Sequence, residues 1–499
     1  MVAFEELPYD ITFKIVESVS STNASSYQQN LDLNPFHQLK GDTRTLRNLR
    51  LVSKSFNHLA VSFLFSDFSF SPSHYGLEKC HAMLSDLSMQ KTSVFSSTTS
   101  LCLIIGIWWD PKLANLCVKP WFELWDLMLP TMTNLRTVIW SYWLLWSYPI
   151  EWVNGSIEAL GSLKSLTNLT IFFHNDHPPP ALSLVPICGL RRLSIHWCLY
   201  RGMTMALRAQ ISSLLARCPD LQDFAFSVDA HIFSHRKIKP TIALKGLLEG
   251  FCRLSIPLKL QRLSTRGVVS CPEDFLVHIR HFRSLEELKV KVDPSPSASD
   301  HIGEICAILR REGIHLKALS ITALHHPEVI RYISSFNAIE CFSLQSLDPL
   351  DDHPGSIDSF FSALNQHRQT LKTLKLDVNR KSPWPQALKS HLQKEAGMYK
   401  SLRVLCSRVY VTPEEATSND IWPLHGWLDT VIGLPSLQRL ECPYVSYKTG
   451  SYYFTRDSND LINPGGIYSP YTRDLMRQVV CAFMQNRGPK FEIDTRQFT

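Results

Sequence analysis

A short apolar motif, L-x-x-L-x-L with aliphatic or aromatic substitutes, recurs in full or shortened form along this 499-residue chain. Its first residues lie 23 to 39 positions apart, often 31. A motif at such intervals is typical of repeat architectures, in which each unit contacts only its neighbours. The recurrences begin at Leu135, Leu166, Leu190, Leu221, Leu260, Leu285, Leu316, Ile339, Leu371, Leu402 and Leu437, and Leu101-x-Leu103-x-Ile105 is an earlier, degenerate copy.

Each copy of the motif predicts a short strand with one apolar face. Alternate side chains of a strand share a face, so the second and third apolar residues point the same way, while the first packs in the approach to the strand. No single unit can bury that face. Stacked units form one core, in which each buried leucine contributes roughly 2 kcal/mol. Strands paired edge to edge also satisfy their backbone groups.

Helical patterns, with apolar residues three and four positions apart, lie between the motifs. Strand and helix alternating at this interval imply a parallel coil with right-handed connections. We therefore expect an α/β solenoid of short parallel strands backed by helices. The alternative is a mixed α/β domain that reuses the motif. The expected helices span residues 206–218, 242–251, 272–282, 302–311, 328–336 and 357–367.

The N-terminal segment follows a different pattern, which predicts two amphipathic helices. Pro8 suits the first turn of a helix, and Ile11, Ile15 and Val19 follow as one apolar stripe. Residues from about 20 to 42 are rich in Ser, Asn and Gln and predict a polar insertion. The second helix carries an apolar seam formed by Leu46, Leu49, Val52, Phe56, Leu59 and Phe63.

This pair of helices resembles the F-box of many fungal proteins over roughly residues 4–66. The family's pattern has a Leu-Pro opening, an Ile stripe, and a helix ending in Val-x-Lys-x-aromatic-x-x-Leu-Ala. The resemblance implies an F-box-like helical hairpin that binds the Skp-type adaptor of a cullin–RING ubiquitin ligase. The adaptor-binding residues that it implies are Leu7, Pro8, Ile11, Ile15, Leu49, Val52, Ser53, Lys54, Phe56 and Leu59.

Two departures from the family's pattern are visible. The polar insertion replaces what is usually a short turn, although a longer surface loop costs little entropy. Ser53 and Phe56 stand where Cys and Trp are commoner. The alternative interpretation of the segment is a helical cap on the N-terminal end of the solenoid.

The repeats resemble the irregular leucine-rich repeats that often follow F-boxes. Their interval exceeds the roughly 20–29 residues of regular leucine-rich repeats, and they lack the Asn ladder of those repeats. Helix-backed units with longer loops would account for the interval. The predicted organisation is an F-box-like domain at 1–66, a linker at 67–96, a leucine-rich-repeat-like solenoid at 97–446, and a C-terminal loop with a capping helix at 447–499.

Polar side chains between the motif's leucines are expected on the sheet face opposite the helices. They are mildly basic and would suit an acidic or phosphorylated protein segment, the alternative being an ordinary solvated face. The aromatic residues Trp140, Trp143, Trp146, Tyr148 and Trp152 are expected in the core, with an exposed binding surface as the alternative. The candidate target-binding residues are Arg191, Arg192, Arg262, Lys289, Lys317, Lys372 and Lys375.

No catalytic chemistry is expected from the sequence. It contains no phosphate-binding loop, dinucleotide-binding glycine motif or nucleophile elbow, so neither catalytic residues nor cofactors are predicted. His231 and His235 lack a third ligand at metal spacing, and Asp348, Asp351 and Asp352 lack the Gly and Glu of a calcium loop. No metal site is therefore predicted.

Composition limits the partners and the compartment. The net charge of +6 is weak and no basic block occurs, so no nucleic-acid partner is expected. The most apolar run, residues 101–109, is too short to span a bilayer, so no membrane association is expected. Thirteen scattered cysteines without a C-x-x-C pair fit buried thiols in a reducing cytoplasm or nucleus.

The expected function follows from both resemblances. The chain would be the substrate-recognition subunit of a Skp–cullin–F-box ubiquitin ligase, with the F-box bound to the adaptor and the solenoid bound to an unknown target protein. The alternative is a leucine-rich-repeat scaffold that acts without a ubiquitin ligase.

Overall fold

The chain is α/β and forms two compact units, residues 1–260 with 280–282 and residues 261–279 with 283–499. The computed structural model describes isolated positions between 79 and 89 and residues 9–21, 43–49, 51–70, 97–105, 127–142, 150–173, 182–199, 205–230, 244–254, 256–268, 272–291, 296–322, 326–345, 354–378, 383–407, 409–410, 422–441, 445–446 and 492–494.

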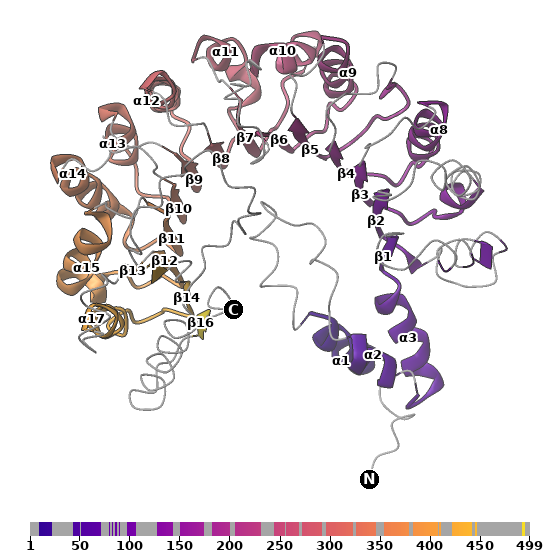
Figure 1. Cartoon of the computed structure of the whole chain (residues 1–499), viewed down its shortest axis with the longest axis horizontal. Coiled ribbons are helices and arrows are strands. Elements are labelled where there is room, and N and C mark those ends of the chain that lie inside the picture. Colours follow the sequence, from indigo (N-terminus) through magenta and orange to yellow (C-terminus); the bar gives the residue numbers. More distant parts are fainter. Residues whose placement is uncertain are drawn as a thin grey trace, which may run out of the picture. The chain divides into compact units, whose positions relative to one another are not determined.

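The first unit begins with a bundle of three short helices, α1 (Tyr9–Ser21), α2 (Thr43–Leu49) and α3 (Lys54–Leu64) (Figure 1). All three pack on one another. Their buried core consists of Val16, Leu46, Phe56 and Leu59, with Leu49, Phe63 and Leu64 partly buried around it. Such a core is small, so the bundle gains only modest stability from burial.

The second N-terminal helix is broken in two, contrary to the continuous seam expected from Leu46 to Phe63. The backbone N–H groups of Leu51 and Val52 donate to carbonyls three residues earlier, at 3.0 and 3.1 Å. Ser53 is extended, and its hydroxyl accepts a 3.2 Å hydrogen bond from the Phe56 N–H. Serine is a strong helix N-cap, so Ser53 starts a new helix here.

Parallel strands follow α3 in the first unit, in the order of the sequence. The first strand is separated from α3 only by Phe65 and Ser66. Residues 67–70 fall within the linker predicted from the sequence, but they form a strand that pairs with the next one. The N–H groups of Thr99 and Ser100 donate to the Ser66 carbonyl at the start of this pairing. The strands are β1 (Asp67–Phe70), β2 (Ser100–Ile105), β3 (Thr137–Tyr142), β4 (Asn168–Phe173), β5 (Arg192–Leu199) and β6 (Asp223–Ala230).

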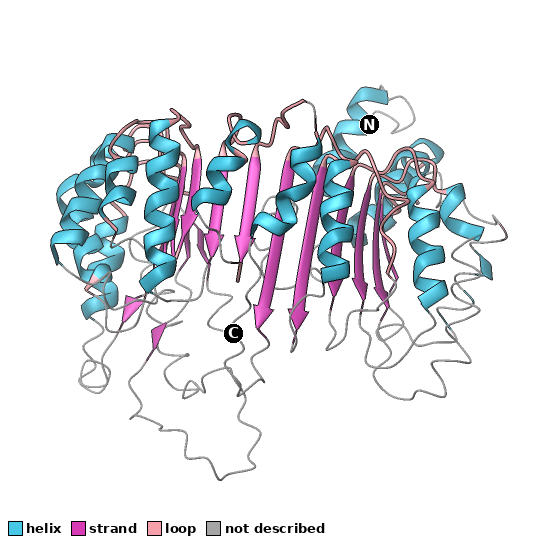
Figure 2. Ribbon diagram, turned by 90° about the horizontal axis from the view of Figure 1, so that it is seen from above, coloured by secondary structure: helices cyan, strands magenta, loops and turns pink. Residues whose placement is uncertain are grey.

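Helical segments lie between strands of the first unit or after its last strand, and they cover one face of its sheet (Figure 2). We call the other side of the sheet the front face. The segments are η3 (Leu129–Thr131), α8 (Ile150–Gly161), α9 (Met205–Ala216), α10 (Leu244–Leu248) and η4 (Glu249–Arg253).

The second unit repeats this arrangement. Its sheet runs in parallel order through β7 (Arg262–Arg266), β8 (Glu287–Lys291), β9 (Ala318–Ile321), β10 (Cys341–Leu344), β11 (Thr373–Leu376), β12 (Val404–Ser407), β14 (Arg439–Glu441) and β16 (Glu492–Asp494). A separate parallel pair is formed by β13 (Val409–Tyr410) and β15 (Val445–Ser446). The expected capping helix at 471–486 lies outside the described residues.

Helices again cover one face of this sheet (Figures 1 and 2). They are α11 (Pro272–Val277), α12 (Pro296–Arg311), α13 (Pro327–Ile333), α14 (Pro354–Leu364), α15 (Trp384–Glu395) and α17 (Trp422–Val431), with the shorter turns η5 (Ile279–His281), η7 (Asn365–His367) and η8 (Ala396–Met398). Helix α12 is followed by Gly313, whose φ of 66° lets the chain reverse toward β9.

The motif's second apolar residues align in register across each unit, which confirms the stacked parallel strands predicted from the repeat. One row in the first unit contains Leu101, Val138, Leu169, Leu193 and Phe224. The corresponding row in the second unit contains Leu263, Leu288, Leu319, Phe342, Leu374, Leu405 and Leu440. All these side chains are buried, as are the motif's first residues from Leu135 to Leu437. The core of each unit therefore lies between the sheet and its helices.

A backbone ladder fixes the edge of each sheet where the strands begin. The carbonyl oxygen of Arg136 accepts from the N–H groups of Thr167 and Asn168, both at 2.9 Å. In the second unit, the Glu286 carbonyl accepts from Lys317 and Ala318 in the same way. The residue that carries this carbonyl immediately follows the motif's first apolar residue. We call these residues the rim row and include Thr99, at the corresponding place before β2, and Gln222, whose N–H donates to the Arg191 carbonyl. The row is Thr99, Arg136, Thr167, Arg191 and Gln222 in the first unit and Gln261, Glu286, Lys317, Glu340, Lys372 and Arg403 in the second.

Candidate protein-interaction surfaces

Helix α1 presents three large apolar side chains to solvent, of which Phe13 is 37% exposed and also contacts the Phe63 ring of α3. Ile11 is 42% exposed and Ile15 is 36% exposed, whereas their neighbours Thr12 and Val16 are buried. Residues four apart lie on one face of a helix, so Ile11 and Ile15 form a single exposed strip. The predicted stripe is confirmed at Ile11 and Ile15, while the side chain of Val19, its third member, lies outside the described part. Val16 beside the stripe supplies the contact with the bundle core.

A second exposed apolar site lies where α2 ends and α3 begins. Leu51 is 86% exposed and Val52 is 47% exposed. Both lie in the turn that precedes the Ser53 cap, and Lys54 beyond it is also exposed. This site owes its exposure to the break between the helices, since a continuous helix would carry Val52 on the buried seam.

The structure separates the predicted adaptor-binding residues by burial. Phe56 and Leu59 belong to the bundle core and Leu49 packs against it. Ile11, Ile15, Val52 and Lys54 are exposed, while Ser53 caps α3. Leu7 and Pro8 lie outside the described residues.

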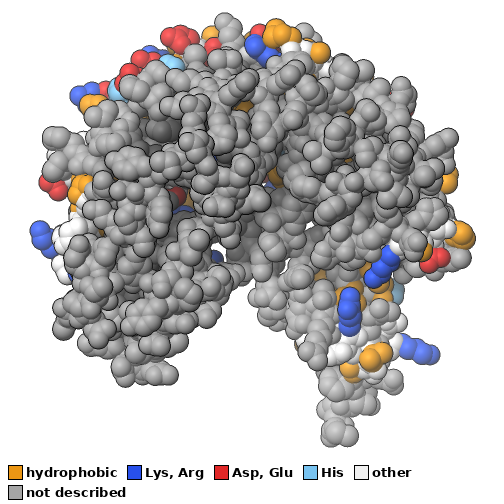
Figure 3. Space-filling view, viewed as in Figure 1, with side chains coloured by type: hydrophobic (Ala, Val, Ile, Leu, Met, Phe, Trp, Pro, Cys, Tyr) orange, Lys and Arg blue, Asp and Glu red, His pale blue; other side chains and the backbone are white. Residues whose placement is uncertain are grey.

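The exposed part of the bundle therefore mixes apolar and basic side chains. In the space-filling view, hydrophobic atoms lie beside Lys and Arg side chains over α1 to α3 (Figure 3). Apolar side chains grouped on a surface mark sites of protein association more often than isolated ones do.

The candidate basic residues of the second unit are paired with carboxylates. Lys317 Nζ lies 2.9 Å from Glu286 Oε1, a residue of the neighbouring strand's approach. Lys372 pairs with Glu340 in the same way, at 2.6 Å. All four residues belong to the rim row of the second unit. Along these four, acidic and basic residues alternate from one strand to the next.

The same compensation extends along the strands. Arg262 and Lys289 share Glu287, at 3.4 and 3.1 Å, and Lys375 contacts Glu441 at 3.2 Å. Exposed ion pairs add little stability, but they cancel the local charge. Positive and negative side chains therefore balance at these residues, on the face of the second unit's sheet opposite its helices.

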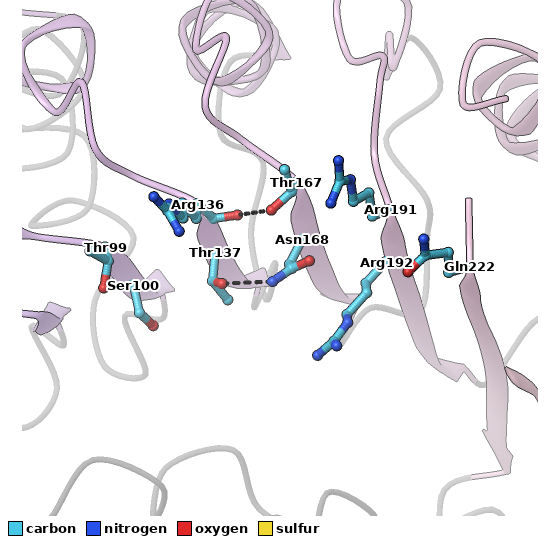
Figure 4. A pocket seen from close by; sticks show the side chains of 9 residues that line it. All are labelled: Thr99, Ser100, Arg136, Thr137, Thr167, Asn168, Arg191, Arg192 and Gln222. Carbon is cyan, nitrogen blue, oxygen red and sulfur yellow. Dashed lines mark hydrogen bonds between the residues drawn. The ribbon is translucent and has the colours of Figure 1, made fainter. Parts of the chain in front are cut away.

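The first unit carries a pocket of about 410 Å³ at its rim (Figure 4). It is formed where β2 to β6 begin, and its described lining is polar. The lining residues are Thr99, Ser100, Arg136, Thr137, Thr167, Asn168, Arg191, Arg192 and Gln222. None of these nine is acidic.

Hydrogen bonds between neighbouring strands hold the pocket's short side chains. Asn168 Nδ2 donates to Thr137 Oγ1 at 3.0 Å, and Thr167 Oγ1 donates to the Arg136 carbonyl at 3.3 Å (Figure 4). Arg192 Nε lies 2.9 Å from Asp223 Oδ2, so this arginine is neutralised.

Arg136 and Arg191 differ from the other candidate basic residues. Both are exposed, and neither has a carboxylate partner among the described residues. The sequence selected Arg191 but missed Arg136, although both directly follow the first leucine of a motif. Position within the motif was therefore the signal that would have found Arg136.

The other predicted sites fall in the core or outside the described residues. Trp140 is buried in the core, as expected, and the side chains of the remaining aromatic residues of that group are not described. His231, His235, Asp348, Asp351 and Asp352 also lie outside. Within the described ranges, no three His, Cys, Asp or Glu residues are placed to share a metal ion.

Several thiols behave as core side chains. Cys102, Cys218, Cys306 and Cys406 are buried, whereas Cys188 and Cys252 are exposed. Burial raises the pKa of Cys102 and of Cys218 to about 11, and that of Cys306 to about 12. These three thiols therefore stay protonated and unreactive near neutral pH.

Among the helices that can be described, none combines the length and apolarity needed to cross a membrane. No protein-family model matches the chain, and no curated protein sequence matches it either.

Proposed function

We propose that this chain is a non-enzymatic substrate receptor of a Skp–cullin–F-box ubiquitin ligase. In this proposal, α1 to α3 form the F-box and bind the Skp-type adaptor, and the leucine-rich repeats bind a target protein. The observation that carries the proposal is the exposed strip of Ile11 and Ile15 on a bundle whose own core is already filled by Val16, Phe56 and Leu59. A partner would cover this strip and stabilise a small bundle by mass action.

The mechanism in this proposal is proximity. The bundle holds the chain on the ligase, and the rim and front face of the repeats hold the target near the ubiquitin-transferring subunits. The alternative is a repeat scaffold without a ligase, in which α1 to α3 serve as the N-terminal cap of the first sheet. The observation that supports this alternative is the short connection from α3 to β1, since a helical cap would be continuous with the sheet.

Co-purification of the full chain with a recombinant Skp-type adaptor tests the proposal. Ile11→Asp with Ile15→Asp places two carboxylates on the exposed strip, where burial in an interface would leave them unpaired. We expect the wild type to bind and the double variant to lose at least about tenfold in affinity. The helical content of the variant should stay unchanged because both side chains are exposed.

Val185→Asp supplies the control, since Val185 is an exposed apolar residue in the first unit outside the bundle. It should bind the adaptor like the wild type. Phe56 is unsuitable for this purpose because it lies in the bundle core, so a charge there would unfold the bundle. Absence of a complex with the wild-type chain would overturn the ligase proposal, and an intact complex in the double variant would remove Ile11 and Ile15 from the interface.

A further inference from the structure

The rim pocket of the first unit is built to hold negative charge. Its described lining brings together the guanidinium groups of Arg136 and Arg191 with hydroxyl and amide groups, and contains no carboxylate. In the second unit, the rim-row lysines Lys317 and Lys372 are each neutralised by a glutamate. Arg192 of the same pocket is paired with Asp223, so Arg136 and Arg191 are the two lining cations for which the described residues supply no carboxylate.

The two arginines have a defined separation. Arg136 precedes β3 and Arg191 precedes β5, with Thr167 of the same row between them. Neighbouring strands lie about 4.8 Å apart, so the backbones of Arg136 and Arg191 are roughly 10 Å apart along the rim. One small anion would be reached by both guanidinium groups only if the side chains converge. If two anions lay about 10 Å apart, each arginine could bind one of them with its side chain extended.

An extended peptide laid along the rim supplies that interval. In the polyproline II conformation, every third side chain points the same way and the repeat is about 9 Å. Carboxylates at positions i and i+3 of such a segment would match the two arginines, each of which can bind a carboxylate through two parallel hydrogen bonds. The Thr99 hydroxyl already donates to the Ser66 carbonyl at 3.3 Å, and the Ser100 hydroxyl is hydrogen-bonded to Asp67. The side-chain amide of Gln222 is therefore the group we assign to the peptide backbone.

We propose that the first unit's rim pocket binds an extended acidic protein segment with carboxylates three residues apart. The proposal deepens the target-binding role given to the repeats above and rests on it. It assigns Arg136 and Arg191 as the recognition residues. The paired cations of the second unit are assigned no part in this contact.

Fluorescence anisotropy of labelled peptides with the full chain tests the proposal. The probe is a peptide of repeated Glu-Pro-Pro, which favours polyproline II and places a carboxylate at every third residue. The same peptide with Gln in place of Glu removes the charge. A peptide of the same composition with all its Glu residues in one block keeps the charge and removes the spacing.

We expect the wild type to bind the Glu-Pro-Pro peptide more tightly than the other two, with an affinity that falls as salt is added. Arg136→Gln with Arg191→Gln should weaken binding about tenfold or more, since each change removes a charge-assisted contact. Lys317→Gln with Lys372→Gln is the matched control, which should change the affinity by no more than about twofold because these lysines are already paired.

Each remaining outcome contradicts a stated part of the proposal. Equal binding of the Gln peptide, or an equal loss in the lysine variant, would overturn the site. Equal binding of the block peptide would overturn the spacing, and binding of only a phosphoserine counterpart would overturn the choice of carboxylate. The arginine variant should still bind the adaptor and the Ile11/Ile15 variant should still bind the peptide, so failure of this proposal is separable from failure of the ligase proposal.

Discussion

The imidazole of His367 accepts a hydrogen bond from the backbone N–H of Ile339, with 3.2 Å between Nδ1 and the backbone nitrogen. Its Nε2 lies 2.9 Å from the Ile333 carbonyl oxygen. Because Nδ1 accepts, the proton must be on Nε2, which donates to that carbonyl. Ile339 is the first residue of a motif, so a buried neutral histidine fixes the approach to β10.

Removing this imidazole should destabilise the second unit. His367→Ala leaves the buried Ile339 N–H and Ile333 carbonyl without their partner, at a cost of about 1–3 kcal/mol before any cavity term. Hydrogen-exchange protection of β10 and the urea midpoint of the second unit measure the effect. Gln366→Ala, one residue away and exposed, should leave both unchanged. Equal protection in both variants would show that the histidine contacts are not needed.

The same residue should make the second unit sensitive to acid. Burial lowers the pKa of His367 below its ordinary value of 6.5, although its backbone hydrogen bonds act in the opposite direction. A base with a lowered pKa in the folded state binds fewer protons there than in the unfolded chain, so stability is complete above about pH 6.5 and falls as the pH drops below it.

Urea midpoints measured at neutral and mildly acidic pH test this dependence. His367→Gln should show a smaller loss of stability on acidification than the wild type. Some dependence should remain because burial also lowers the pKa of His391. An undiminished pH dependence in His367→Gln would contradict the assignment.

The preceding strand of the second unit, β9, is held in the same way by a tyrosine hydroxyl. Tyr332 Oη accepts from the Leu316 N–H at 3.1 Å and donates to the Ile314 carbonyl at 2.9 Å. Tyr332→Phe removes only the hydroxyl, so the expected loss of about 1–3 kcal/mol in unfolding free energy comes from two unpaired backbone groups. Hydrogen-exchange protection of β9 is the measurement.

Tyr399→Phe gives the comparison for this prediction. The Tyr399 hydroxyl donates to Asn365 Oδ1 at 3.0 Å and lies 2.8 Å from His391 Nε2. These partners are partly buried side chains that can turn toward water, so the loss should be smaller than for Tyr332→Phe. A larger loss in Tyr399→Phe would contradict this reasoning.

The leucine rows could be predicted from the sequence because they depend only on local alternation. Leu169 and Leu193 belong to separate motifs, yet each motif alone indicates which residues face the core, and both are buried in register. The neutralisation of Lys317 could not be read in this way. It depends on which residue of the neighbouring strand lies beside Lys317. Because the repeats differ in length, the sequence spacing does not give this register.

The N-terminal bundle shows a second limit. Periodicity identified the strip of Ile11 and Ile15 but could not say whether that strip or the adjoining Val16 faces the bundle core, since only packing decides. The seam through Leu49, Val52 and Phe56 likewise suggested one helix. The local preference of Ser53 for capping outweighed the seam and exposed Val52. The sequence thus identified residues of the candidate site, but it could not tell which of them are exposed and which are buried.

Substitution of Ser53 tests whether that cap sets the start of α3. Ser53→Ala removes the oxygen that accepts from the Phe56 N–H, and should lower the stability of the bundle by about 1 kcal/mol. Hydrogen-exchange protection in α3 measures the change.

Ser53→Asp is the decisive comparison because aspartate caps a helix about as well as serine and adds a negative charge at its N-terminus. The first turn of α3 contains no acidic residue, so this charge meets no repulsion there. Protection in Ser53→Asp should therefore equal or exceed that of the wild type. If both variants lose protection equally, Ser53 does not act as a hydrogen-bond acceptor, and the exposure of Leu51 and Val52 requires another cause.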